Sequence, residues 1–512
     1  MANQLDEQGR SGVSDSLLEM APLVRQLRGQ LDTLSSFQAQ PEDDGGPPPP
    51  RIIVAKVRDL TRNVASSEYD PDHVSIGPYN YPRPESKTPR LAKQRDKLTS
   101  LRAVLSAAKP GMTVESYVNE LTRLEPQARS CYENTFDDLT RDDFVRMLLL
   151  DGCYILNRFV RLRVRARSIT DDDVGTASNG SRSSSTTSAD VGLAANGSSS
   201  TASDDVATAA NGGSTTARGA AALEALAVVR DVFFLAENQI PFFVLEKIGE
   251  LTNLVGEDSA STWIAEHALD LMSRQEYAKA APAMVPHWPG NLLHLLHMHL
   301  KPNDALLRGA ADRSASSGRW RTATEYSYAG VKFMSRAMSE TRSVRCILDV
   351  NLDGGTLEVP QLDIDNETWR LLRNLMALEQ RNGVTIGSYV TAYCVFMSQL
   401  AGTPRDVELL SKRRIIVHAH GNDDEVAKCF ADLCKGIVFN IGDPAVNYLW
   451  NTRQKLDKRS RSYRRRWMAW LRRKYFSNPW LFVGLLAAAV GLLCAVVQSV
   501  YSVLSYYEQG QN

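Results

Sequence analysis

The chain has 512 residues, enough for roughly two to four average domains, and 43% of them are hydrophobic. Its 59 Lys and Arg residues balance 59 Asp and Glu residues, for a formal net charge of zero. This balance excludes the overall positive charge typical of nucleic-acid-binding proteins, so no nucleic-acid partner is expected. The 7 cysteines are scattered without a CxxC pair, which favours reduced thiols over a disulfide framework.

Residues 1–51 are predicted to be a polar, largely disordered N-terminal region. Their one amphipathic stripe, between Leu17 and Leu31, is short and contains Pro22. The region has no apolar signal-peptide core and ends in the stiff linker PEDDGGPPPP, so we expect neither a secretory leader nor a packed domain there.

Residues 52–450 are predicted to form a mainly α domain with a minor β-hairpin. Residues 144–156 are apolar almost all round, as in a buried helix. A hairpin is expected over 345–360, around Asp353-Gly354-Gly355. Further helices are expected over 220–236, 242–254, 368–382 and 386–400, with a break at Asn382-Gly383.

Residues 168–219 are predicted to be a disordered surface insertion in this domain. They consist almost wholly of Ser, Thr, Ala, Gly, Asp and Asn, with a degenerate repeat that begins at residues 173, 190 and 205. The repeat has no hydrophobic face that could stack on its neighbours. Such a composition cannot bury enough apolar surface to offset the entropy of ordering.

The string VSIGPYNY, at residues 74–81, is predicted to be a structural turn. Gly77-Pro78 supplies the turn, and Tyr79 is expected to pack it down. The alternative is a phosphate-binding loop. We do not favour it, because one glycine followed by proline offers few backbone N–H groups to an anion.

A polar island stands between two apolar runs in FFLAENQIPFFVL, residues 233–245. Glu237, Asn238 and Gln239 must find hydrogen bonds if they are buried. One hypothesis is a network that satisfies a helix end where Pro241 lacks an N–H. The other is a ligand site with Glu237 as acid or base, and Asp151, inside the apolar run 144–156, is the second catalytic candidate.

Two groups of histidines and cysteines have metal-ligand chemistry, but their spacing matches no familiar zinc module. They are His294, His297 and His299, and His418, His420, Cys429 and Cys434. No metal or cofactor is therefore expected. The chain also lacks a P-loop, HExxH, GxSxG or kinase signature, so an enzyme is not favoured.

The C-terminal region is predicted to be a membrane anchor. Residues 480–504 are strongly apolar and are expected to form a transmembrane helix, with 505–512 as a short tail. The flanking charge predicts a single-pass, tail-anchored protein whose N-terminal domain is cytosolic. The basic juxtamembrane segment 451–479 is expected to bind an anionic lipid surface through Arg464, Arg465, Arg466, Arg472, Arg473 and Lys474.

Several of these stretches together resemble DUF247, a plant family of unknown function that is also called UPF0481. The resemblance runs from about residue 52 to residue 504 and rests on VSIGPYNY at 74–81, RSCY at 129–132, FVRMLLLDGCYIL at 144–156, RDVFFLAENQIPFFVLEKI at 230–248, ATEYSYAGVKF at 323–333 and LDVNLDGGTLEVPQLDIDNETWRLLRNLMALEQ at 348–380. The family-motif residues are Gly77, Pro78, Tyr79, Asp151, Gly152, Glu237, Asn238, Gln239 and Pro241.

The resemblance implies a helical, membrane-anchored plant protein and carries no catalytic residue set. We therefore expect a non-enzymatic protein-interaction or signalling component on the cytosolic face, with an unknown protein partner. One alternative is an enzyme of an unrecognised class that uses buried carboxylates. The other is a component of pollen–stigma recognition, because some grass relatives are associated with self-incompatibility.

Overall fold

The computed structural model describes residues 51–82, 93–175, 228–254, 259–281, 289–307, 321–339, 344–461 and 479–509. The chain divides into two units, Met1–Pro50 and Arg51–Asn512, and every described residue belongs to the second. The predictions for residues 1–50 therefore lie outside the described residues.

Residues 51–82 form an irregular segment that we call the strap. It contains only one helical turn, α2 (Asp59–Arg62), and one 3-10 turn, η1 (Ser66–Glu68). Its first part joins the rest of the chain through a parallel bridge between Val54 and Tyr132. With so few backbone hydrogen bonds of its own, the strap depends on other segments to satisfy its N–H and C=O groups.

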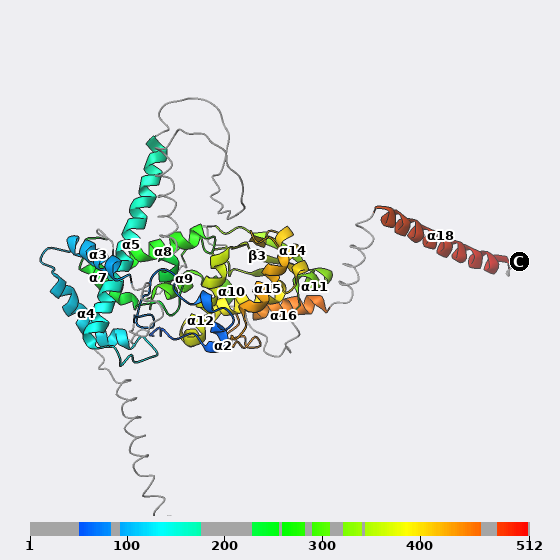
Figure 1. The fold of residues 1–512 in the computed structure, drawn as a ribbon. Helices are drawn as coiled ribbons and strands as arrows, with labels where there is room; N and C mark the ends of the chain where they lie inside the picture. The colour runs from blue at the N-terminus through cyan, green and yellow to red at the C-terminus, as the bar shows by residue number, and fades with distance from the viewer. Residues whose placement is uncertain are drawn as a thin grey trace, which may run out of the picture. The chain divides into compact units, whose positions relative to one another are not determined.

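The long helix α5 (Arg141–Gly175) packs against α3 (Gln94–Ser106), α4 (Val114–Arg129) and α7 (Phe242–Glu250), as Figure 1 shows. Its first half has apolar residues on every side, and Phe144, Leu148 and Cys153 are fully buried. This confirms the predicted buried helix, because Arg146 is the one exposed residue between Phe144 and Asn157.

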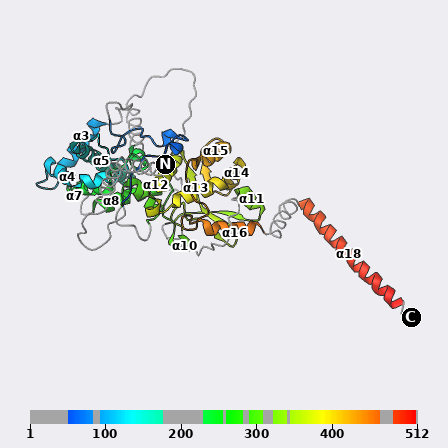
Figure 2. The same ribbon diagram turned by 90° about the horizontal axis from the view of Figure 1, so that it is seen from below.

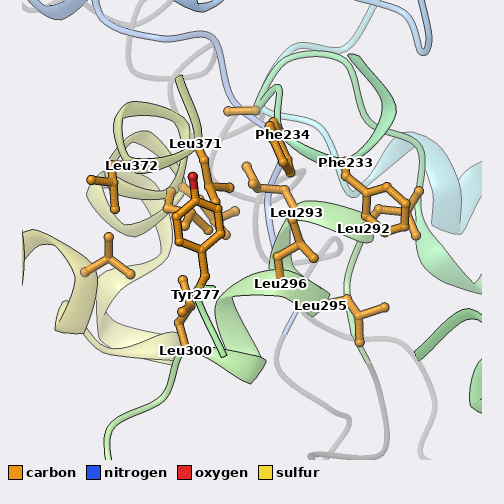
Figure 3. Close-up of a cluster of buried hydrophobic side chains, with 14 of the residues drawn as sticks. Phe233, Phe234, Tyr277, Leu292, Leu293, Leu295, Leu296, Leu300, Leu371 and Leu372 are labelled. Carbon is orange, nitrogen blue, oxygen red and sulfur yellow. The ribbon is translucent and has the colours of Figure 1, made fainter. Parts of the chain in front are cut away.

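A shared hydrophobic cluster connects residues 228–234, of which 228–233 are helical, with α9 (Leu292–His299) and α12 (Asn366–Ile386). Figure 3 shows Phe234, Leu293 and Leu371 from these three segments in one group of apolar side chains. All eight side chains of α9 are buried, so this short helix lies inside the core. α8 (Ala260–Arg274) packs next to α9.

The C-terminal half of the core is a second group of helices. α13 (Tyr389–Leu400) packs on α12 and α15 (Asp423–Leu433), and α14 (Pro404–Lys412) packs on α15, as Figure 2 shows. The remaining helices of this half are α10 (Asp304–Leu307), α11 (Ala323–Tyr328) and α16 (Trp450–Ser460).

Two small sheets accompany these helices. In the first, β3 (Thr356–Pro360) lies between β1 (Lys332–Arg336), which is parallel to it, and β2 (Asn351–Asp353), which is antiparallel. In the second, β4 (Leu362–Ile364) pairs in parallel with β5 (Ile416–His418). The prediction of a mainly α fold with a minor hairpin is confirmed, with β1, β4 and β5 added.

Two predicted boundaries were wrong, for local reasons. The first hairpin strand is shorter than expected, because the Asp349 carboxylate accepts the N–H groups of Arg345 (2.7 Å) and Cys346 (3.1 Å) and turns the chain there. α12 does not break at Asn382-Gly383. It continues to Ile386 and ends at Gly387, whose positive φ of 83° suits a residue without a side chain.

The predicted disordered insertion, residues 168–219, overlaps the end of α5. Because α5 extends to Gly175, residues 168–175 are helical. Residues 176–219, with the repeats at 190 and 205, lie outside the described residues, as does the predicted helical start at 220–227.

The structure contradicts the predicted membrane anchor. The segment 480–504 is helical, within α18 (Pro479–Gln509). However, a span needs roughly 20 consecutive, predominantly apolar residues in one helix. Within the described ranges, no helix combines the necessary length and apolar character. The transmembrane helix, the single-pass and tail-anchored topology and the membrane localisation are therefore corrected. Arg464, Arg465, Arg466, Arg472, Arg473 and Lys474 lie outside the described residues.

Candidate functional site

The predicted site residues converge on a buried polar network that holds the strap. We call it the strap network, and its polar side chains are Lys97, Asp151, Asp231, Glu237, Asn238, Gln239, Asn374 and Asn382. All eight are buried. They come from α3, α5, the segment 231–239 and α12. Because these elements lie far apart in the chain, the network exists only in the folded protein.

Glu237 binds the first part of the strap through a hydrogen bond and an ion pair. Its Oε1 atom accepts the backbone N–H of Val57 at 2.6 Å and forms an ion pair with Arg62 at 2.7 Å. Arg62 in turn pairs with Asp70 at 2.5 Å. The carboxylate, with a 6% exposed side chain, therefore joins the residues before α2 to the end of α2.

Asp151 fastens the VSIGPY turn from the buried face of α5. Its Oδ2 atom accepts the N–H of Gly77 at 2.9 Å, and its Oδ1 atom pairs with Lys97 Nζ at 2.5 Å. The ammonium also donates to the Ser75 carbonyl at 2.7 Å. Both side chains are buried, so each charge depends on the other for compensation.

Asn238 and Gln239 satisfy both the strap and a helix end. The Asn238 amide accepts the Ile76 N–H (2.7 Å) and donates to the Val74 carbonyl (3.0 Å), in the manner of a neighbouring strand. The Gln239 amide donates to the carbonyls of Val232 (2.8 Å) and Leu235 (2.9 Å), at and just beyond the end of the helical residues 228–233. These contacts match the hypothesis of a structural network that satisfies a helix end.

Asp231 binds several backbone N–H groups of the strap, and the sequence analysis did not predict this role. Its carboxylate accepts the N–H groups of three successive strap residues, Asp72, His73 and Val74, at 2.5–3.2 Å. The residue is 0% exposed. In the sequence, Asp231 is a single carboxylate beside the apolar stretch that precedes the polar island. A lone acid of this kind does not indicate which group it binds.

Two asparagines of α12 were also missed. Asn374 donates to the Glu68 carbonyl (2.8 Å) and accepts the Ala236 N–H (2.9 Å). Asn382 accepts the N–H of Ile53 (2.8 Å) and donates to the same residue's carbonyl (2.9 Å). On a helix face these amides resemble ordinary surface residues, so the sequence contained no cue to their role.

The glycines of the family motifs allow close approach of backbone and side chains. Gly77 has a positive φ of 71°, and a Cβ there would lie 2.5 Å from the Gln239 carbonyl oxygen. A Cβ at Gly152 would lie 2.4 Å from Cδ1 of Ile248 on α7. Pro241 precedes α7 as its N-cap. The VSIGPY segment is therefore a structural turn, as predicted.

Tyr79 packs this turn onto the aromatic side chains of the neighbouring segment. Its ring lies edge-on to Phe136, with 4.9 Å between centroids. Burial raises the pKa of Tyr79 to about 12, so the phenol stays protonated and donates to the Val54 carbonyl at 3.3 Å. Pro78 follows Gly77 in the turn, and its carbonyl accepts the Tyr81 N–H at 3.4 Å.

A surface hollow of about 640 Å³ lies elsewhere, beside the N-terminal ends of α14 and α15. His418 bridges Asp423 (3.0 Å) and the His420 carbonyl (3.2 Å). Asn422 caps α15 by accepting the Asp424 N–H at 2.9 Å. The hollow is lined by Pro404, Arg405, Glu408, His418, His420, Gly421, Asn422, Asp423 and Asp424. Glu237 and Asp151 do not line it.

The histidines of α9 serve separate hydrogen bonds. His297 pairs with Glu379 at 2.7 Å, and that carboxylate also accepts two N–H groups at the start of α13. His294 accepts the Gly290 N–H at 3.0 Å, and burial lowers its pKa to about 3. His299 bonds the Leu295 carbonyl. Within the described ranges, no group of three His, Cys, Asp or Glu residues could hold a metal ion.

The two cysteines of the second group are partly buried, near α13. Ser398 donates to Cys434 Sγ at 3.5 Å. Burial raises the pKa of Cys434 to about 11 and also raises the pKa of Cys429, so both remain thiols at neutral pH. Neither lines the hollow that contains His418 and His420.

The strap network can bind backbone groups and pair charges, but it is poorly suited to acid–base catalysis. A general acid or base must reach a substrate within hydrogen-bond distance. Glu237 and Asp151 instead direct their oxygens at strap N–H groups and at the cations of Arg62 and Lys97. The geometry therefore favours a structural role for both carboxylates.

The matches to known proteins extend over most of the chain, as the motifs described above do. The chain is 25% identical over 465 residues to the UPF0481 protein At3g47200 of Arabidopsis thaliana, covering 86% of this chain and 83% of that protein. No solved structure matches. The family model DUF247, described as plant protein of unknown function, matches residues 54–494. The chain therefore belongs to the DUF247 family of plant proteins.

Proposed function

We propose that this protein is a non-enzymatic protein-binding module. The observation that carries the proposal is the use of the motif side chains. Glu237, Asp151 and Asn238 all bind the strap backbone. A catalytic carboxylate would be aimed into a cleft, whereas these groups hold one segment on the surface of the core.

Fixing a segment in this way serves recognition. An irregular strand held by buried side chains presents its outward residues in one conformation, and binding then costs less conformational entropy. The strap has outward residues of this kind, because Lys56, Arg58 and Leu60 are exposed while Val54 and Val57 are buried. A role in pollen–stigma recognition stays a prediction by family analogy.

Proximity labelling with the full chain at native expression tests the proposal. We expect a reproducible set of neighbouring proteins, of which at least one binds the purified full chain directly in isothermal titration calorimetry. The variant Glu237→Gln keeps an acceptor for the Val57 N–H and removes the carboxylate. We therefore expect it to keep the same partners.

Two results would contradict the proposal. The first is the absence of any protein that binds the purified chain directly. The second is a Glu237→Gln variant that keeps its thermal stability and its partners but loses the cellular activity of the wild type. That outcome would assign chemistry to the carboxylate and favour the enzyme hypothesis.

A further inference from the structure

Three large hydrophobic side chains are strongly exposed on neighbouring segments. Leu60 on α2 is 75% exposed, Val438 is 71% exposed and Val384 on α12 is fully exposed. Single exposed hydrophobics are common on protein surfaces, but several in one place indicate an interaction site. We call these three residues the strap face.

Hydrogen bonds bring the three segments of the strap face together. The Gln380 side chain exchanges two hydrogen bonds of 3.1 Å with the backbone of Val438, and Val384 lies one helical turn beyond Gln380. Thr61, next to Leu60, donates to the Gly436 carbonyl at 3.2 Å. A Cβ at Gly436 would lie 2.8 Å from the Leu60 carbonyl oxygen.

Two exposed basic residues precede Leu60 in the strap. Residues 51–58 of the strap carry Arg51, Lys56 and Arg58 and no acid. Lys56 and Arg58 are exposed and have no ion-pair partner among the described residues. Asp59 follows them as the nearest acid in the strap.

Cations on the neighbouring segments are already compensated. Arg381 of α12 pairs with Glu133 at 3.2 Å. Lys435 pairs with Asp432 at 2.5 Å. The exposed charges beside Leu60 that have no ion-pair partner among the described residues are Lys56, Arg58 and Asp59, so the charge that remains there for a partner is positive by one.

We propose that the strap face binds an acidic, amphipathic helical segment of a partner protein. The apolar side of that helix covers Leu60, Val384 and Val438, and its carboxylates meet Lys56 and Arg58. An apolar centre with a charged rim is the usual anatomy of a protein interface, and an amphipathic helix on an apolar surface is a common mode of peptide recognition.

Charge argues for an acidic partner over a second copy of this chain. A symmetric dimer through the strap face brings Lys56 and Arg58 of both copies together, and like charges across an interface oppose binding. The inference rests on the proposed function, since it names the surface and the chemistry of a protein partner. Its test therefore separates the failure of the surface from the failure of protein binding.

Two synthetic helical peptides are the probes. They share a leucine stripe at positions i, i+3, i+4 and i+7, and their other face carries Glu in one peptide and Lys in the other. Binding to the purified full chain is measured by fluorescence anisotropy. We expect the acidic peptide to bind at least about tenfold more tightly than the basic one, and added salt to narrow the difference.

Two variants locate the binding surface. Leu60→Asp combined with Val438→Asp is expected to weaken binding of the acidic peptide by about tenfold or more, because both anchors become charged. Lys56→Glu combined with Arg58→Glu is expected to reverse the preference between the two peptides. All four positions are solvent-exposed, so thermal melting curves should match the wild type.

Matched controls lie on α3. Leu98 is 48% exposed and Arg102 is exposed, so Leu98→Asp and Arg102→Glu make the same chemical changes away from the strap face. They are expected to leave both affinities unchanged. Equal binding of the two peptides, or equal effects of the control variants, would overturn the inference.

Two further outcomes separate this inference from the proposed function. If partners found by proximity labelling bind the Leu60→Asp, Val438→Asp chain as they bind the wild type, protein binding stands and the strap face is not its site. If analytical ultracentrifugation shows a dimer that these substitutions abolish, the occupant is a second copy and the inference of an acidic partner falls.

Discussion

The strap network and the hollow between α14 and α15 are both rich in polar side chains, but they differ in where the partners come from. In the strap network, Glu237 binds a residue 180 positions away and Asn382 binds one 329 positions away. In the hollow, Asn422 and His418 bind groups two to five positions away. The first region joins distant parts of the chain, and the second shapes the ends of individual helices.

This difference teaches which polar residues carry the tertiary structure. A long-range hydrogen bond to a buried N–H group has no substitute when it is lost, because water cannot reach the site. A local cap at the surface can be replaced by water. Substitutions in the strap network should therefore cost several times as much stability as substitutions in the hollow.

The largest effect is expected for Asp151→Asn. The substitution leaves the Lys97 ammonium buried without its carboxylate, and removing one partner of a buried ion pair costs about 3–5 kcal/mol. Urea unfolding followed by circular dichroism measures the change in free energy of unfolding.

The double variant Lys97→Met, Asp151→Asn is the control for Asp151→Asn. It removes the orphaned charge, so it should be more stable than Asp151→Asn alone. A loss below about 1 kcal/mol for Asp151→Asn would contradict the burial of an essential pair and would weaken the contrast between the two regions.

A slightly smaller effect is expected for Gly77→Ala. An alanine at a positive φ costs about 1–2 kcal/mol, and the Cβ would also press on the Gln239 carbonyl oxygen. We expect a total loss of about 3 kcal/mol in thermal or urea unfolding. Gly354→Ala also has a positive φ but meets no atom within 4 Å, so it isolates the steric part. Equal losses for both variants would contradict the close approach.

His294 tests whether burial or distance along the chain determines how much a polar residue affects stability. Its hydrogen bond is local, but its side chain is buried. Burial lowers its pKa from 6.5 to about 3, so between those pH values the unfolded state binds the extra proton. Stability therefore falls as the pH falls below about 6.5, by about 2 kcal/mol between pH 7 and pH 5.

The variant His294→Gln tests this pH dependence, since it keeps an acceptor and does not titrate. Its unfolding free energy should lose about 2 kcal/mol less than the wild type between pH 7 and pH 5. His299, whose pKa burial also lowers, acts in the same direction and remains in both proteins. Parallel pH profiles for wild type and variant would show that His294 is not buried as the structure has it.

Sequence reasoning recovered the parts of this molecule that depend on neighbours in the chain. The apolar run 144–156 identified the buried start of α5. The polar island identified Gln239, whose amide caps the helical residues just before it. In both cases the cause lies within a few residues of the effect.

What it missed depends on residues that the fold brings from far away. Asp231 and Asn374 bind strap groups 157–159 and 306 positions away, and no local pattern names such a partner. The same explanation covers the break expected at Asn382-Gly383. The Asn382 amide bonds to Ile53 and to the Leu378 carbonyl, and α12 continues past a dipeptide that usually ends a helix.

The smallest effect is expected for Asn422→Ala in the hollow. The substitution removes the cap of α15 and leaves the Asp424 N–H to water, at a cost of about 1 kcal/mol. Asn422→Asp keeps an acceptor oxygen at the same place and should restore most of that loss in urea unfolding. A loss for Asn422→Ala as large as that for Asp151→Asn would mean that exposure and short chain separation do not weaken a polar contact here. In that case the hollow would contribute to the tertiary structure as much as the strap network does, and its lining residues would be the next ones to substitute.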